Sequence, residues 1–194
     1  MFEIFERYIK QTNKVSDQDL DILKERCVEK KVRKGQFLLN EGEVWSLLCF
    51  IASGCFRVFR TDKDGIDHTF RFGIENWWVT EMISYNHKKP SDYNIEALTA
   101  STILVWTKKD WEEILSLSPA VKLFNDQLHG RAYEAAQRRI YSLISKSATE
   151  KYFEFQEMYP QVFNKVPLHM VASYLGISRE TLSRIRKENL KETS

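Results

Sequence analysis

Between residues 28 and 106, hydrophobic side chains recur at every second position in short runs, and turns that contain glycine separate the runs. In one run the apolar Phe56 and Val58 alternate with the charged Arg57. Such alternation is typical of a strand that is buried on one face. An Asp-Gly pair at residues 64–65 follows and predicts a hairpin turn into the next run. Short strands at this regular spacing predict a β sandwich, jelly roll or barrel.

The expected strands cover the hydrophobic runs at residues 37–39, 47–51, 55–60, 68–72, 93–97 and 102–106. Helical periodicity precedes them, because Phe2, Phe5 and Ile9 recur at the spacing of one helix face within residues 1–25. The helical period returns near Thr107. The chain therefore begins with a helical lead-in that we expect to pack on the β region.

Ser118 and Pro119 supply an N-cap and a first-turn proline for a long helix that can run to about Ser145. A helix of about 25 residues is about 37 Å long at a rise of about 1.5 Å per residue. The apolar positions close to a heptad seam are Val121, Phe124, Leu128, Ala132 and Ala135. Two interpretations remain open: the seam pairs with a second copy of the chain, which we favour, or the helix lies flat on the β domain.

Two further helices are predicted near the C-terminus, after a capped helix that starts at Ser147 and Glu150 and ends at Pro160. Pro167 suits the first turn of the next helix, and the small Ala172 lets another helix cross closely. The buried stripe of the last helix comprises Ile177, Leu182 and Ile185. Gly176 permits the positive φ of a tight turn between the two helices, and Ser178 caps the last helix. This pattern predicts a helix-turn-helix.

The outer face of the last helix carries Arg179, Glu180, Ser183, Arg184 and Lys187. Such a helix can lie in the major groove of DNA with its first turns at the base edges. Arginine matches the two acceptors of guanine, and a carboxylate can accept from cytosine. Groups that suit phosphate are Ser178, Thr181 and either Arg186 or Lys187. The alternative interpretation is an ordinary solvated helix hairpin.

Charge is distributed unevenly along the chain, whose net charge is +2. Residues 131–194 contain eleven Lys and Arg and seven Asp and Glu, a balance of +4, so the first 130 residues carry −2. A basic C-terminal portion is the expected footprint of a nucleic-acid contact.

Residues 176–185, which read Gly-Ile-Ser-Arg-Glu-Thr-Leu-Ser-Arg-Ile, closely resemble the recognition motif of Crp/Fnr regulators, the cyclic-AMP receptor protein family. The resemblance covers nearly the whole chain, and the glycines similar to the turn glycines of the family's jelly roll are Gly35, Gly42, Gly54 and Gly65. It implies a transcription regulator that binds an approximately palindromic DNA operator as a homodimer, with RNA polymerase as a further partner to consider.

The resemblance also assigns roles to residues of the last helix. Arg179, Glu180 and Arg184 match the base-reading positions of the family, whereas Ser178 and Thr181 match its phosphate contacts. An effector in the β domain would then favour one arrangement of the dimer helices and so control DNA affinity.

The chain departs from the family where cyclic nucleotides bind. Family members cradle the phosphate with a Gly-Glu-Leu turn followed by Arg-Ser or Arg-Thr, and the matching segments here are Thr80-Glu81-Met82 and Pro90-Ser91. Proline cannot replace the charge-assisted grip of arginine, so we expect no tight binding of cyclic AMP. Candidate residues for the pocket of an unidentified effector are Trp78, Thr80, Glu81, Met82, Pro90 and Ser91. The aromatic residues there either line a bulkier pocket or belong to the core, which we favour.

The expected architecture is α+β. A cyclic-nucleotide-binding-type β jelly roll covers residues 1–117, a dimerisation helix covers residues 118–146, and a winged-helix-like helix-turn-helix domain covers residues 147–194. Few residues follow the recognition helix, so we expect any wing to be missing or very short.

Other function classes find less support in the sequence. Without a long apolar run or a signal peptide, we expect a cytoplasmic protein with no membrane partner. Cys27, Cys49 and Cys55 form no C-x-x-C pair and are expected to be buried thiols. The four histidines lack metal-ligand spacing and no catalytic motif appears, so we expect no enzyme. The alternatives are a metal- or haem-containing jelly-roll sensor, a cupin-like enzyme, and an interaction module that no longer binds DNA.

Overall fold

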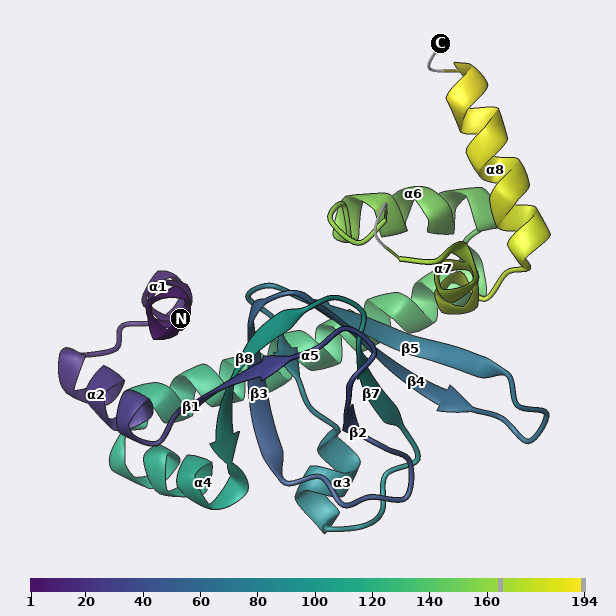
Figure 1. Ribbon diagram of the computed structural model, residues 1–194. Coiled ribbons are helices and arrows are strands. Elements are labelled where there is room, and N and C mark those ends of the chain that lie inside the picture. The colour runs from purple at the N-terminus through teal and green to yellow at the C-terminus, as the bar shows by residue number, and fades with distance from the viewer. Residues whose placement is uncertain (164–165, 193–194) are drawn as a thin grey trace.

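Two four-stranded antiparallel sheets form the centre of the computed structural model, which describes residues 1–163 and 166–192 (Figure 1). The strands are β1 (Val28–Val32), β2 (Phe37–Leu39), β3 (Leu47–Ser53), β4 (Cys55–Thr61), β5 (Asp67–Ile74), β6 (Trp78–Val79), β7 (Asn94–Ala97) and β8 (Ser101–Thr107). One sheet has the order β1-β8-β3-β6 and the other the order β2-β7-β4-β5. The predicted α+β fold with a jelly-roll-type β domain is confirmed.

Some short elements were not expected from the sequence pattern. β1 reads Val-Glu-Lys-Lys-Val and carries little apolar signal, so its strand conformation depends on pairing with β8. β6 contains two residues, and α3 (Met82–His87) is a six-residue helix capped by Glu81. Elements this short are set by their neighbours rather than by their own periodicity.

Aromatic rings from helices and strands build the core of the β domain. The ring of Phe5 in α1 (Phe2–Thr12) lies 5.2 Å from the ring of Phe50, 5.8 Å from that of Trp78 and 5.1 Å from that of Trp106. Buried aromatic pairs at such distances contribute beyond their buried area. With α2 (Asp17–Glu25), α1 confirms the predicted helical lead-in that packs on the β region.

The chain leaves the β domain through α4 (Lys108–Leu117) and the long helix α5 (Pro119–Ser145). The hydroxyl of Ser118 accepts a hydrogen bond from the amide of Val121 at 3.1 Å, so the predicted cap is confirmed. The predicted seam is wrong for Val121 and Phe124, because both side chains are fully buried in the β-domain core. Leu128 is the last of the predicted seam residues that packs against this core.

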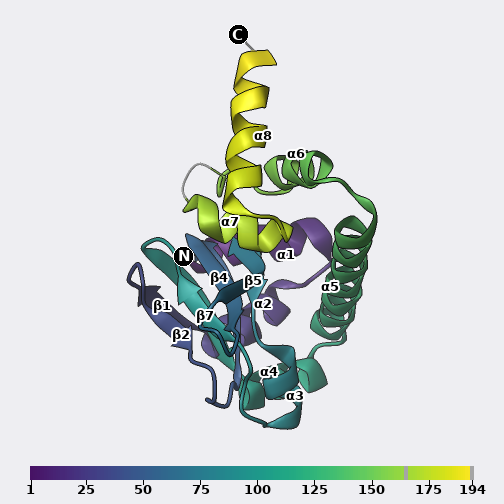
Figure 2. The ribbon, with the colours of Figure 1, turned by 90° about the vertical axis from the view of Figure 1, so that its right-hand side faces the viewer.

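Three helices form the C-terminal part: α6 (Ala148–Met158), α7 (Leu168–Leu175) and α8 (Arg179–Glu192). Ser147 and Glu150 form the predicted capping box of α6. Figure 2 shows these helices above β4 and β5, with α5 along one side of the molecule. Between residues 148 and 163 and between 166 and 192 the chain contains helices and no strand, so no wing is seen in these ranges.

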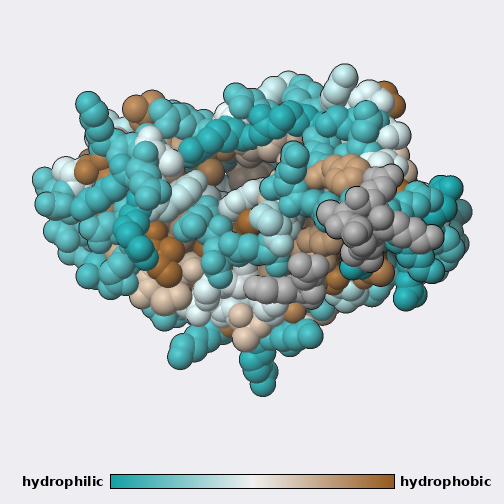
Figure 3. Space-filling view, turned by 90° about the horizontal axis from the view of Figure 1, so that it is seen from above, coloured by the Kyte–Doolittle hydropathy of each residue, from teal (hydrophilic) through white to brown (hydrophobic). Residues whose placement is uncertain are grey.

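The molecular surface is mainly hydrophilic on the side that carries the C-terminal helices. Figure 3 shows this face, on which hydrophobic residues gather in separate patches. Among the described residues, no helix combines the length and the hydropathy needed to span a membrane.

Candidate nucleic-acid interface

A tight turn at Gly176 sets the angle between α7 and α8. Gly176 adopts φ +66° and ends α7 in the left-handed region, as predicted. The amide of Ile177 donates to the carbonyl of Ala172 at 3.1 Å, which satisfies the end of α7. Pro167 precedes α7 as its N-cap residue, one position earlier than predicted. The helix-turn-helix geometry therefore follows from local signals.

The buried stripe of α8 determines which face the helix exposes. Leu182 is 0% exposed and Ile185 is 4% exposed, in a cluster that includes Phe155 of α6 and Val171 of α7. Residues three or four apart lie on the same face of a helix. Burial of this face therefore turns the opposite face of α8 outward.

We call the residues Arg179, Glu180, Ser183, Arg184 and Lys187 the outer face of α8. Together with Glu188 they line one shallow surface hollow. Ser183 is half-buried and the other four are exposed. Neither Arg179 nor Arg184 forms a salt bridge with a carboxylate of the described side chains, so both guanidinium groups are available for a ligand. Glu188 was not predicted, although its spacing of four residues from Arg184 places it on the same face.

Glu180 carries a negative charge on this face at neutral pH. Its own backbone N–H and the hydroxyl of Ser178 donate to the carboxylate, and the charge of Arg179 adds to their effect. These interactions favour the ionised form and hold the pKa of Glu180 below its ordinary value. The outer face of α8 therefore offers both strong donors and a strong acceptor.

The first turn of α8 presents two hydroxyl groups that are already hydrogen-bonded to each other. Ser178 Oγ lies 3.0 Å from Thr181 Oγ1 and accepts from the Thr181 amide at 3.1 Å, which confirms the predicted cap. Further along, the half-buried Arg186 guanidinium lies 5.3 Å from the ring centroid of Phe163, whereas Lys187 is exposed. The phosphate contacts of these four residues stay predictions.

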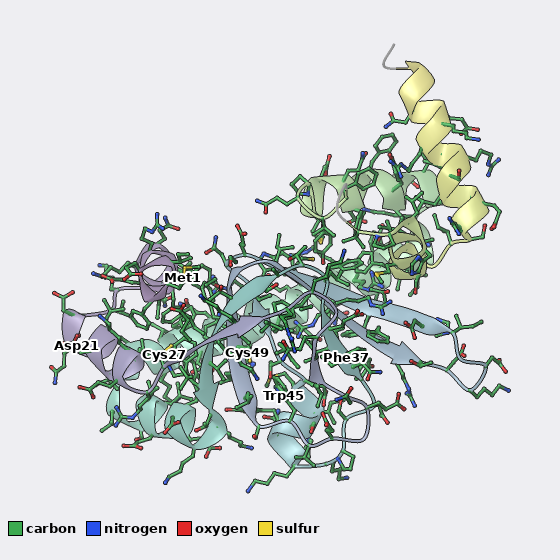
Figure 4. All side chains as sticks on the ribbon, viewed as in Figure 1. Met1, Asp21, Cys27, Phe37, Trp45 and Cys49 are labelled. Atoms are coloured by element: carbon green, nitrogen blue, oxygen red, sulfur yellow. The ribbon has the colours of Figure 1, made fainter. Side chains whose placement is uncertain are left out.

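Several polar groups of the predicted effector pocket are bonded within the protein. The Glu81 carboxylate accepts from the amides of Ile83 at 3.0 Å and Ser84 at 2.6 Å, so both of its oxygens cap α3. Thr80 Oγ1 accepts at 2.8 Å from the indole N–H of Trp45, which Figure 4 labels beside α3. The polar atoms of both side chains therefore already have hydrogen-bond partners within the protein.

The remaining candidates of that pocket are also integrated into the fold. Ser91 Oγ accepts from the amide of Tyr93 at 2.9 Å, and Pro90 forms an isolated β-bridge with the loop before β3. Trp78 is buried among the core aromatic rings, and Met82 packs against the same core. The effector pocket therefore stays a prediction, and the structure places Trp78 in the core.

Arg71 of β5 was not predicted as a site residue, but it contacts Thr80, at the start of the predicted effector segment, from the other sheet. Its Nη2 donates to the carbonyl of Thr80 at 2.6 Å. Burial lowers the pKa of the Arg71 guanidinium, and the nearby Tyr159 hydroxyl and Glu81 carboxylate only partly offset this effect. Arg71 pairs across the sheet with the buried Val58, a relationship that no local motif encodes.

A metal-dependent alternative has no candidate centre in the part of the chain that the structure describes, since no group of three or more His, Cys, Asp or Glu side chains there could hold an ion. Cys49 and Cys55 are buried and Cys27 is half-buried. Burial raises the pKa of the Cys49 and Cys27 thiols to about 12. Thiols in this state are poor nucleophiles and poor metal ligands at neutral pH.

The family model of the cyclic nucleotide-binding domain matches residues 29–118. No curated protein matches the sequence. The matched segment spans β1 to α4 and ends where α5 begins.

Solved structures extend the similarity to most of the chain. FixK2 from Bradyrhizobium japonicum superposes with a TM-score of 0.75 at 16% identity, over 86% of this chain and 86% of that chain. Catabolite Activator Protein from Thermus thermophilus gives 0.57 at 20% identity, over 92% and 85%. A Crp/Fnr-family transcriptional regulator from Eubacterium rectale gives 0.67 at 18% identity, over 92% and 85%. At identities this low, the superpositions establish a shared fold and no more.

Proposed function

Because residues 29–118 match the family model of the cyclic nucleotide-binding domain and the chain shares the fold of Crp/Fnr regulators, we propose that it is a sequence-specific DNA-binding transcription regulator. The observation that carries the proposal is the outer face of α8. Neither of its two arginines forms a salt bridge with a described carboxylate, and ionised Glu180 lies between them in sequence. This face projects away from the buried Leu182 and Ile185, as a helix that enters a major groove requires.

The contacts divide into base and phosphate readers. Arg179 and Arg184 donate to guanine acceptors, and the Glu180 carboxylate accepts from cytosine N4. Ser178, Thr181, Arg186 and Lys187 contact phosphates, with Ser183 between the two groups. The N-terminal end of α8 adds the partial positive charge of the helix dipole at the same place.

The regulator acts as a homodimer through the face of α5 that the β domain leaves uncovered. Tyr133, Ile140 and Ile144 there are 67%, 53% and 81% exposed. Positions spaced alternately by three and four residues form an exposed heptad seam: Leu123, Asp126, Gly130, Tyr133, Gln137, Ile140 and Ile144. Exposed apolar side chains in this pattern are covered when a second copy of α5 packs against them.

When two α5 helices pair, a twofold axis relates the two α8 helices of the dimer. Recognition helices related in this way contact half-sites about 34 Å apart, which is about one turn of DNA, on an approximately palindromic operator. RNA polymerase bound beside the operator is then the partner through which such a regulator would act.

A small molecule in the β domain controls this dimer. The guanidinium of the half-buried Arg71, which donates to Thr80, favours an anionic effector, since an anion would compensate its charge. Pro90 stands where the resembling cassettes carry arginine, so tight binding of cyclic AMP is not expected. Native mass spectrometry of the full chain tests for a retained ligand.

Gel-shift titrations of the full chain with genomic DNA fragments at several salt concentrations test the proposed function. Arg186 and Lys187 of both subunits supply about four phosphate contacts, so the logarithm of the affinity for a selected fragment should fall with the logarithm of the salt concentration with a slope of about −4. The selected fragment should also bind more tightly than a shuffled fragment of the same length and composition. Equal binding to both fragments, or no binding at low salt, would contradict sequence-specific recognition.

A further inference from the structure

We propose that a clasp between β5, α5 and α7 holds α8 in a fixed orientation relative to the β domain. The clasp comprises Asp67, Thr69, Arg139, Ser173 and Tyr174. The clasp itself is a property of the free protein. Its consequence for DNA binding rests on the proposed function.

The clasp starts at the open edge of a sheet. β5 is the last strand in the order β2-β7-β4-β5, and an edge strand presents N–H and C=O groups without a strand partner. Ser173 Oγ of α7 accepts from the Thr69 amide at 2.8 Å and donates to the Asp67 carbonyl at 2.9 Å. One serine hydroxyl thus makes both hydrogen bonds that a neighbouring strand would make at this position.

Arg139 connects α5 to the same point. Its Nη2 donates to the carbonyl of Tyr174 at 2.8 Å, and its guanidinium carbon lies 3.7 Å from the centroid of the Tyr174 ring. A longer hydrogen bond of 3.5 Å joins Nη2 to the carbonyl of Thr69. The proposed dimer helix, the β domain and α7 therefore meet at Thr69 and Tyr174.

An aromatic cluster that joins β5 to the C-terminal helices lies beside the clasp. Phe72 of β5 is fully buried, and its ring lies 5.8 Å from Phe155, 5.9 Å from Tyr159 and 5.5 Å from Tyr174. Apolar burial has little directional preference, whereas hydrogen bonds weaken steeply when they are misaligned. We therefore assign the docking affinity to the cluster and the orientation to the clasp.

The docked arrangement leaves the outer face of α8 exposed, so the clasp does not block that face. Its role is to order α8 before DNA binds, because a domain that must be ordered on binding loses affinity. Arg71 lies two residues from Thr69 on β5 and holds the carbonyl of Thr80. β5 therefore links the start of the predicted effector segment to the clasp, and a ligand that displaces Arg71 would shift the strand that holds α7.

Amide hydrogen exchange in the free full-length protein tests the clasp without any DNA. Ser173→Ala removes the acceptor of the Thr69 amide, so exchange at Thr69 should accelerate by about tenfold or more. The Leu182 amide, which donates to the Ser178 carbonyl at 3.1 Å within α8, should keep its protection. The matched control is Ser145→Ala. The exposed hydroxyl of Ser145 donates to the carbonyl of Tyr141 in its own helix, so its removal should leave the exchange rate of the Thr69 amide unchanged.

Arg139→Met provides a second variant that removes the donors of the clasp from α5 and leaves α7 intact. It should also accelerate exchange at Thr69, and both variants should weaken binding to a selected DNA fragment by about threefold to tenfold. Unchanged exchange at Thr69 in Ser173→Ala would overturn the clasp. Loss of protection at both Thr69 and Leu182 would overturn it as well, because Ser173 would then support the fold of the helices rather than their docking. Absence of DNA binding by the wild-type protein would refute the proposed function, while the exchange result would still decide the clasp.

Discussion

Replacing Ile140 and Ile144 together with Asp is expected to convert the dimer into a monomer and to lower operator affinity by about 10²–10⁴-fold. The affinity falls this far because a monomer contacts one half-site instead of two linked half-sites. It therefore loses the gain in affinity that the high effective concentration of the second subunit provides. Both side chains are exposed in the single chain, at 53% and 81%, so the subunit loses no packing of its own. Two carboxylates in each copy of an apolar seam would be desolvated next to like charges, which strongly opposes pairing. Light scattering after size-exclusion chromatography measures the mass of the species.

The matched control is the pair Ala132→Asp and Ala135→Asp. Both residues are exposed on α5, lie outside the exposed seam proposed for the dimer, and belong to the seam expected from the sequence. This control should remain dimeric. A monomeric control beside a dimeric Ile140 and Ile144 variant would show that the partner contacts the other face of α5.

Arg184→Ala is expected to weaken binding to the selected operator by about 1–3 kcal/mol, or about tenfold to 150-fold, and to relax the base preference at one position in each half-site. Arg184 is exposed in the middle of the outer face and has no carboxylate partner among the described side chains, so its removal leaves the fold of α8 unchanged. Binding titrations on the operator and on single-base variants measure both effects.

Arg131→Ala serves as the control for Arg184→Ala, because it removes an exposed cation from α5, outside the outer face of α8. It should change affinity by less than about threefold, which is the scale of a screened long-range charge effect. If Arg184→Ala lowered affinity equally on operator and random DNA, Arg184 would be a phosphate contact and the assignment of base readers would be wrong.

The helix boundaries near the functional site could be predicted from the sequence because their signals are local. Ser118, Ser147 and Ser178 each accept from the amide three residues later, and the side chains that make these caps are visible in the sequence. Gly176 was predictable for the same reason, since a positive φ at the end of a helix favours glycine. The outer face of α8 then follows from helical periodicity alone.

The face of α5 that is free could not be predicted in this way. Val121 and Ile144 both occupy apolar positions on one helix, but Val121 is covered by the β domain and Ile144 is not. Only the tertiary structure divides the helix into a covered and an exposed half. The seam expected from the sequence and the exposed seam lie on the same helix, and packing against the β domain distinguishes them.

Arg71 and Ser173 make tertiary contacts that local patterns do not encode. Arg71 contacts Thr80 across two sheets, and Ser173 contacts Thr69, 104 residues earlier in the chain. From the sequence alone, a polar residue on a helix or strand is expected to be solvent-exposed unless its hydrogen-bond partner is known. The docking of the C-terminal helices on β5 therefore became visible only in the structure.

Base recognition by the outer face of α8 is tested most directly by selecting genomic DNA fragments on the full-length protein and sequencing the enriched pool. One enriched motif is expected, made of two inverted half-sites whose centres are about 10–10.5 base pairs apart, and it should be lost when Arg179→Ala and Arg184→Ala are combined. Enrichment that follows only base composition, or a motif that persists in the double variant, would contradict base recognition by the outer face of α8.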